Sequence, residues 1–72
     1  MRNEEDIKLF KISIIPYLKK AWHKNNVELA NIIEKYDIFG YIDDCYESYE
    51  YMGVGGVIAD IEEFIKEAGG KI

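Results

Sequence analysis

Apolar residues recur at steps of three and four along almost the whole chain, and this spacing constrains the fold more than any other feature. The first apolar stripe consists of Ile7, Phe10, Ile14, Leu18 and Trp22. Side chains spaced in this way share one face of an α-helix. We therefore expect an amphipathic helix from about Asn3 to Lys24. Because Pro16 lacks a backbone donor, a kink or a break is expected between residues 12 and 16.

Three more segments keep the helical spacing. They cover residues 26–36, 38–52 and 57–68. Asn25 precedes Glu28 by three residues, which predicts a capping box at the start of the first of these segments. Asp37 is expected to cap the second segment, and Gly69 with Gly70 is expected to close the third. The spacing thus predicts an all-α fold, a compact bundle of about four short helices.

The class of fold has one alternative. The Tyr, Met, Val and Gly residues of positions 49–58 are also compatible with a small hairpin, which would make the fold α+β. The composition, with 49% hydrophobic and 32% charged residues, excludes the disordered class. The chain has 72 residues and no internal repeat or linker, so we expect a single small helical domain over residues 1–72.

The charges are distributed unevenly along the chain. Between Lys35 and Lys66 there is no Lys or Arg, whereas this segment holds eight acids and five tyrosines, so the net charge of -5 originates there. Asp37 suits a helix cap. Three further acids suit the first turn of the last helix, where negative charge is favoured by the helix dipole. They are Asp60, Glu62 and Glu63.

The other acids of this segment fall on the helix expected over residues 38–52. Together with two tyrosines they form the predicted partner-binding residues, called here the acidic-aromatic surface: Asp43, Asp44, Tyr46, Glu47, Glu50 and Tyr51. The inward stripe of the same helix is expected to be Tyr41, Cys45, Tyr49 and Met52. Acids beside exposed tyrosines suit an Arg-rich protein surface. The alternative is that the tyrosines only fill a small core.

No catalytic signature is present. A nucleophile pair would need Cys45 and His23 in hydrogen-bond reach, yet Cys45 falls on the expected apolar face and His23 near a helix end. Asp43 and Glu47 share a helix face, but the looped ligand sequence of a calcium site is lacking. The Gly-rich segment 53–56 lacks the Lys and the preceding strand of a phosphate-binding loop. We expect no enzymatic activity, no cofactor and no metal.

Charge also bears on nucleic acid and on location. Residues 27–47 are compatible with a helix-turn-helix, but its second helix would present acids to phosphates, so no direct contact with nucleic acid is expected. The acidic start of the chain, its short apolar runs and its lone Cys45 favour a cytoplasmic protein that does not insert into a membrane.

Two stretches resemble one known family. They are E-L-A-N-I-I-E-K-Y-D-I-F-G-Y-I, from Glu28 to Ile42, and V-I-A-D-I-E-E-F-I-K, from Val57 to Lys66. Both are similar to the small bacterial proteins of domain of unknown function 3791, in which Gly often stands at the position of Asp37. The resemblance implies an all-helical intracellular module. Some members are encoded beside ADP-ribosyltransferase-like proteins, which implies an antitoxin-like or accessory role.

The expected function is that of a non-enzymatic protein-binding module. Its acidic-aromatic surface would dock on a basic partner protein, with an ADP-ribosyltransferase-like neighbour as a candidate. One alternative is an acidic nucleic-acid mimic that inhibits a nucleic-acid-binding enzyme. Another is a self-associating structural module, such as a homodimer.

Overall fold

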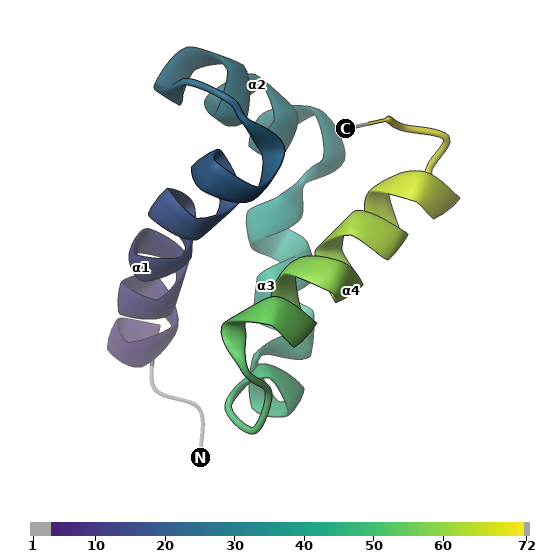
Figure 1. The fold of residues 1–72 in the computed structure, drawn as a ribbon. Helices are drawn as coiled ribbons and strands as arrows, with labels where there is room; N and C mark the ends of the chain where they lie inside the picture. Colours follow the sequence, from purple (N-terminus) through teal and green to yellow (C-terminus); the bar gives the residue numbers. More distant parts are fainter. Residues whose placement is uncertain (1–3, 72) are drawn as a thin grey trace.

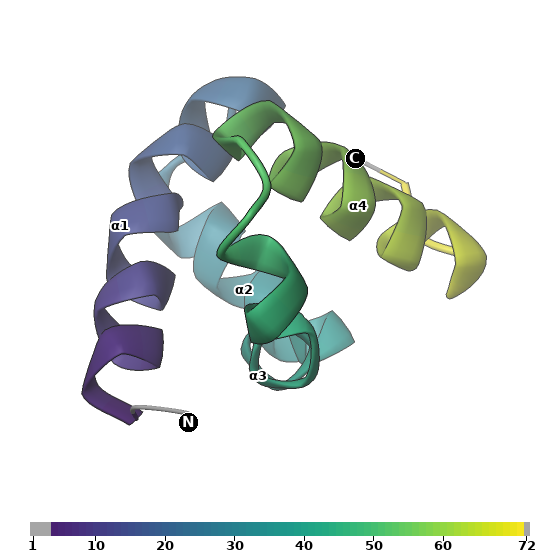
Figure 2. The same ribbon diagram turned by 90° about the horizontal axis from the view of Figure 1, so that it is seen from below.

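The computed structural model describes residues 4–71 and contains four α-helices within them (Figure 1). They are α1 (Glu4–Trp22), α2 (Asn26–Tyr36), α3 (Ile38–Tyr49) and α4 (Val54–Glu67). The expected all-α fold is confirmed, and the hairpin alternative at 49–58 is wrong because this stretch ends α3 and begins α4. α1 and α4 flank α3 in both views, and α2 crosses one end of the bundle (Figures 1 and 2).

α1 continues through Pro16, so of the expected kink or break the break is wrong, and the kink stays a prediction. Ile12 and Pro16 are both exposed, and the Ile12 carbonyl that loses its donor lies on the solvent side of the helix. The helix ends at Trp22, where His23 adopts a left-handed φ of 54° and the Lys24 amide donates to the Lys19 carbonyl at 3.1 Å. This is a Schellman ending, and it gives His23 a structural role. The expected start at residue 3 lies outside the described residues.

α2 begins with the expected capping box. The Asn25 side chain accepts from the Glu28 amide at 2.8 Å, and the Glu28 carboxylate accepts from the Asn25 amide at 3.0 Å. Asp37 alone separates α2 from α3, with φ 49° and ψ 50° in the left-handed region. Its side chain makes no capping hydrogen bond, so the cap expected there is wrong. The carboxylate instead lies against Gly40, where a Cβ would collide with it.

α4 begins at Val54, three residues before the expected start at Val57. Two glycines, Gly55 and Gly56, therefore lie in its first turn, and this turn holds no acid. The expected dipole role of the acids at positions 60, 62 and 63 is wrong because these positions fall in the body of the helix. α3 likewise ends at Tyr49, so the preceding helix is shorter than the expected 38–52.

One cluster of buried side chains joins all four helices. Its members are Ile14, Leu18, Trp22, Leu29, Ile38, Ile42, Tyr49, Val57, Ile61 and Ile65. Removal of this apolar area from water is the main stabilising contribution to a fold of this size. The indole N–H of Trp22 donates to Glu62 at 2.9 Å, which ties α1 to α4 at the edge of the cluster. Between residues 4 and 71, no helix has the length and apolar character needed to cross a membrane.

Candidate functional site on the outer face of α3

The inner side of α3 is joined to α4 by two tyrosines and one carboxylate. The hydroxyl groups of Tyr41 and Tyr49 both donate to Asp60, at 2.8 and 2.6 Å. The ring of Tyr41 also stacks on Phe64, with a centroid distance of 4.0 Å. Asp60 lies three residues after Val57 and four before Phe64, so the helical spacing already placed it towards the core. Sequence reasoning missed this role by assigning Asp60 to a helix terminus.

The environment of these hydroxyl groups favours their neutral form. Burial is the main cause, and the hydrogen bond to Asp60 adds to it, so the pKa values of Tyr41 and Tyr49 lie well above the usual range of tyrosine. Both groups therefore remain donors at neutral pH. Cys45 is partly buried and packs against the core beside these two tyrosines, which agrees with its predicted place on the inward stripe. The arrangement holds two helices together.

Tyr46 does not belong to the exposed part of the acidic-aromatic surface. Its ring is buried and meets Phe10 edge-on, with a centroid distance of 5.7 Å. Burial raises the pKa of the Tyr46 hydroxyl, and the carboxylates of Glu50 and Asp6 add to the shift. Met52 departs from expectation in the opposite sense, because it is exposed instead of inward. The exposure of Met52 follows from the end of α3 at Tyr49, beyond which the helical spacing no longer applies. Tyr46 lies within α3 and is buried because Phe10 of α1 packs on it.

Asp43 contacts α1. Its carboxylate lies 2.7 Å from the Lys11 ammonium group, and both side chains are partly exposed. The same ammonium group lies 5.7 Å from the centroid of the Phe39 ring. A pair of this kind contributes about 0–1 kcal/mol, and here it holds α3 to α1. The interaction within the fold removes Asp43 from the residues best placed to meet a partner.

The remaining predicted residues stay exposed. They form what we call the reduced acidic surface: Asp44, Glu47, Glu50 and Tyr51. Tyr51 is 89% exposed in the turn after α3. Over residues 4–71, Asp44 and Glu47 form no ion pair. In the same part of the chain, no group of three His, Cys, Asp or Glu side chains is placed to hold a metal ion.

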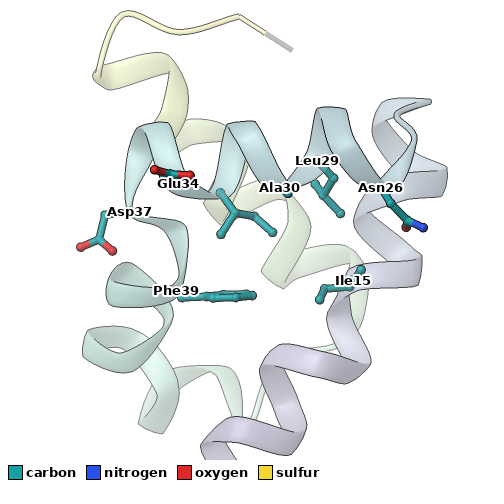
Figure 3. A pocket seen from close by; sticks show the side chains of 8 residues that line it. Ile15, Asn26, Leu29, Ala30, Glu34, Asp37 and Phe39 are labelled. Atoms are coloured by element: carbon teal, nitrogen blue, oxygen red, sulfur yellow. The ribbon is translucent and has the colours of Figure 1, made fainter.

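A second feature was missed from the sequence: an apolar hollow of about 520 Å³ between α1, α2 and the start of α3. Figure 3 shows Ile15, Leu29 and Phe39 around it, with Ala30 between them on α2. Glu34 and Asp37 stand at one side of the hollow (Figure 3). The available sequence signal was Ala30, a small residue next to the bulky apolar stripe of α2.

Comparison with known families gives one match. A family model described as "Protein of unknown function (DUF3791)" matches residues 9–68. The chain belongs to the DUF3791 family. The match extends from the first half of α1 to Ala68, the C-cap of α4, and so includes the reduced acidic surface and the hollow. Comparison of this DUF3791 protein with curated proteins and with solved structures gives no match.

Proposed function

We propose that this DUF3791 protein is a non-enzymatic binding module that docks on a basic protein surface through the reduced acidic surface. The observation that carries the proposal is the exposure of Asp44, Glu47, Glu50 and Tyr51 on a segment without any Lys or Arg. The tyrosines of the inner face serve the fold, whereas these four side chains have no comparable packing role. Exposed residues without a packing role are the ones left to meet a partner.

The acids and the tyrosine would contribute differently to binding. Carboxylates attract a basic partner over roughly a Debye length, about 8 Å at physiological salt, and this raises the association rate. Tyr51 offers an aromatic face on which an Arg guanidinium can stack. Lys can supply the charge but not the planar stacking, so an Arg-rich partner fits better than a Lys-rich one.

The identity of the partner stays a prediction. An antitoxin-like or accessory role beside an ADP-ribosyltransferase-like protein is supported by the family resemblance, and a cytoplasmic location is supported by the lone Cys45. Neither depends on the geometry of α3, so either can fail while the binding role of α3 remains.

Charge reversal on α3 tests the proposal. The native host protein captured by the wild-type chain should bind Asp44→Lys with Glu47→Lys roughly tenfold or more weakly, which corresponds to about 1.4 kcal/mol or more. Both positions are exposed, so the helical circular-dichroism spectrum should stay unchanged. Binding is measured by titration of the captured protein against each purified variant.

The control makes the same change of charge elsewhere. Glu63→Lys with Glu67→Lys alters two exposed acids of α4 and leaves α3 intact. This variant should bind like the wild type at physiological salt. Equal weakening by both double variants would show that only net charge matters, and unchanged binding of the α3 variant would refute the proposal.

Self-association is a second candidate function. The observation in its favour is the exposure of three apolar side chains around the α3–α4 turn, namely Tyr51, Met52 and Val54. If a homodimer forms through this turn, the mass measured by light scattering should rise from that of a monomer to that of a dimer as the protein concentration increases. Val54→Ser should keep the mass of a monomer. The nucleic-acid mimic stays a prediction, tested by whether the captured partner still binds this chain when loaded with nucleic acid.

A further inference from the structure

The hollow beside α2 continues along α1 as a groove. A second hollow, of about 600 Å³, lies along the outer side of α1 and shares Ile15 and Asn26 with the first. Ile12 and Pro16 line this second part, and Ile12 is 56% exposed. We call the two hollows together the α1–α2 groove. Apolar side chains line both hollows, and the lysines at the close of α1 interrupt them. The groove lies on a face away from the α3–α4 turn.

The two ends of the α1–α2 groove carry opposite charge. Lys19, Lys20 and Lys24 line the end at the close of α1. Glu34 and Asp37 line the other end, at the close of α2 (Figure 3). An occupant that matches both ends needs a negative end, a positive end and an apolar side between them. A fatty acid has only one charged end and would leave Glu34 and Asp37 unmatched.

The length of the part of the groove that lies beside α2 follows from this helix, which forms one wall there. Its 11 residues extend about 16 Å at a rise of about 1.5 Å per residue. A bound helix of about three turns would fill such a length, with apolar residues on one face as in other helix-in-groove complexes. Ala30 leaves room for that face, because its side chain is only a methyl group, whereas Leu29 and Ile33 of α2 supply larger apolar side chains to the same hollow.

We propose that the α1–α2 groove binds an amphipathic α-helix of another protein, with the helix C-terminus at the lysine end and its N-terminus at Glu34 and Asp37. The helix macrodipole places partial negative charge at the C-terminus and partial positive charge at the N-terminus, so this direction matches both ends. A separate amphipathic helix fits better than a second copy of this chain, because each of the four described helices already packs its main apolar stripe into its own core.

This site is separate from the reduced acidic surface. The groove is formed by α1, α2 and Phe39, whereas the reduced acidic surface lies on the outer side of α3 and in the turn after it. The two can therefore fail independently. Asp44→Lys with Glu47→Lys should leave binding to the groove unchanged.

Two synthetic helical peptides of about 14 residues, long enough to cover α2, test the proposal. Both have the same composition and the same leucine stripe. The first carries lysines in its first turn and glutamates in its last turn, and the second carries the reverse. The first should bind roughly tenfold more tightly by fluorescence anisotropy, and it should shift the amide resonances of Ile15, Ala30 and Phe39 in NMR spectra.

Variants of the groove complete the test. Ala30→Glu should weaken the first peptide roughly tenfold, whereas the matched change Ala59→Glu, also at an exposed alanine, should not. Lys20→Glu with Lys24→Glu makes both ends of the groove acidic, so it should abolish the preference between the peptides. The proposal is overturned if the wild-type chain binds both peptides equally well or binds neither. It is also overturned if the shifted resonances lie outside the groove, or if the groove binds decanoate in place of the peptides. Self-association abolished by Ala30→Glu would overturn it too, because a second copy would then be the occupant.

Discussion

At the scale of single residues, Asp60 shows how one carboxylate can join two helices. It accepts hydrogen bonds from Tyr41 and Tyr49, whose rings belong to the inner face of α3. Charge-assisted hydrogen bonds of this type contribute roughly 1.5–3 kcal/mol when buried and less when solvent reaches them, as it does at Asp60. Tyrosines that suggested a binding surface are therefore, in part, the means by which α3 holds α4.

The raised pKa of Tyr49 predicts a loss of stability in alkali. The folded pKa lies above the unfolded value of about 10, so above pH 10 the folded state binds more protons than the unfolded chain. This contribution to stability is complete below pH 10 and is lost as the pH rises further. Tyr49→Phe should be about 1 kcal/mol less stable than wild type at pH 8, with a smaller difference at pH 11. Urea unfolding followed by circular dichroism measures both, and a difference that does not shrink would contradict the role of Tyr49.

The left-handed backbone of Asp37 predicts a stabilising substitution. A residue with a Cβ at φ 49° carries a steric cost that Gly avoids, so Asp37→Gly should raise the free energy of unfolding by about 1 kcal/mol. The reverse change, Gly69→Ala at φ 85°, should lower the free energy of unfolding by about the same amount. The left-handed backbone is the only cause of this cost, because no neighbouring atom would touch the new methyl group. Denaturant melts of both variants measure these changes, and destabilisation by Asp37→Gly would contradict the argument.

At the scale of elements, helical spacing predicted four helices with three bounds correct to the residue. The capping pair of Asn25 and Glu28 located α2, because that signal is local in sequence. The start of α4 was missed because Gly53, Gly55 and Gly56 indicated a turn, whereas the bundle keeps Gly55 and Gly56 helical. Local propensity is a weak preference that the packing of Val57 and the residues after it overrides.

The candidate site was predicted only in part from the sequence. Exposure of Asp44 and Glu47 followed from the helical phase of α3, whereas Glu50 and Tyr51 are exposed in the turn after it. The ion pair of Asp43 with Lys11 and the packing of Tyr46 on Phe10 could not be predicted, because they depend on how α1 lies against α3. The groove is also a product of three helices, and no single segment encodes it.

The glycines in the first turn of α4 predict that a substitution by alanine there increases the stability of the protein. Gly55 is helical, exposed and has no atom near the position of a Cβ, so Gly55→Ala should stabilise the protein by about 0.5 kcal/mol. Gly70→Ala is the contrasting control, because its Cβ would collide with the Tyr36 hydroxyl and the Ile65 side chain, at a cost of roughly 1–3 kcal/mol. Thermal melts rank the stabilities of the variants. A lower stability of Gly55→Ala would contradict the prediction and indicate that this glycine has a role other than helix formation.

At the scale of the whole molecule, a small core carries the stability. The radius of gyration is 11.6 Å, close to the value of about 11 Å for a compact chain of this length. A domain of this size has a free energy of unfolding of about 4–11 kcal/mol, so one cavity in the core removes a large share of it.

A graded core series tests that view. Ile61 is fully buried, so Ile61→Val should cost about 1 kcal/mol and Ile61→Ala about 2–5 kcal/mol, enough to populate the unfolded state. Ile12→Ala at an exposed position should change stability by no more than about 0.5 kcal/mol. Urea titrations give all three values, and equal costs at positions 12 and 61 would contradict the assignment of the core.

The central claim is that the outer face of α3 meets a basic protein. Amide hydrogen exchange of the chain, free and bound to its captured host partner, tests this most directly because it reports the contact surface without any substitution. We predict that exchange slows in the fragments that contain Asp44, Glu47, Glu50 and Tyr51. Unchanged exchange in these fragments, with protection confined to α4, would contradict the claim.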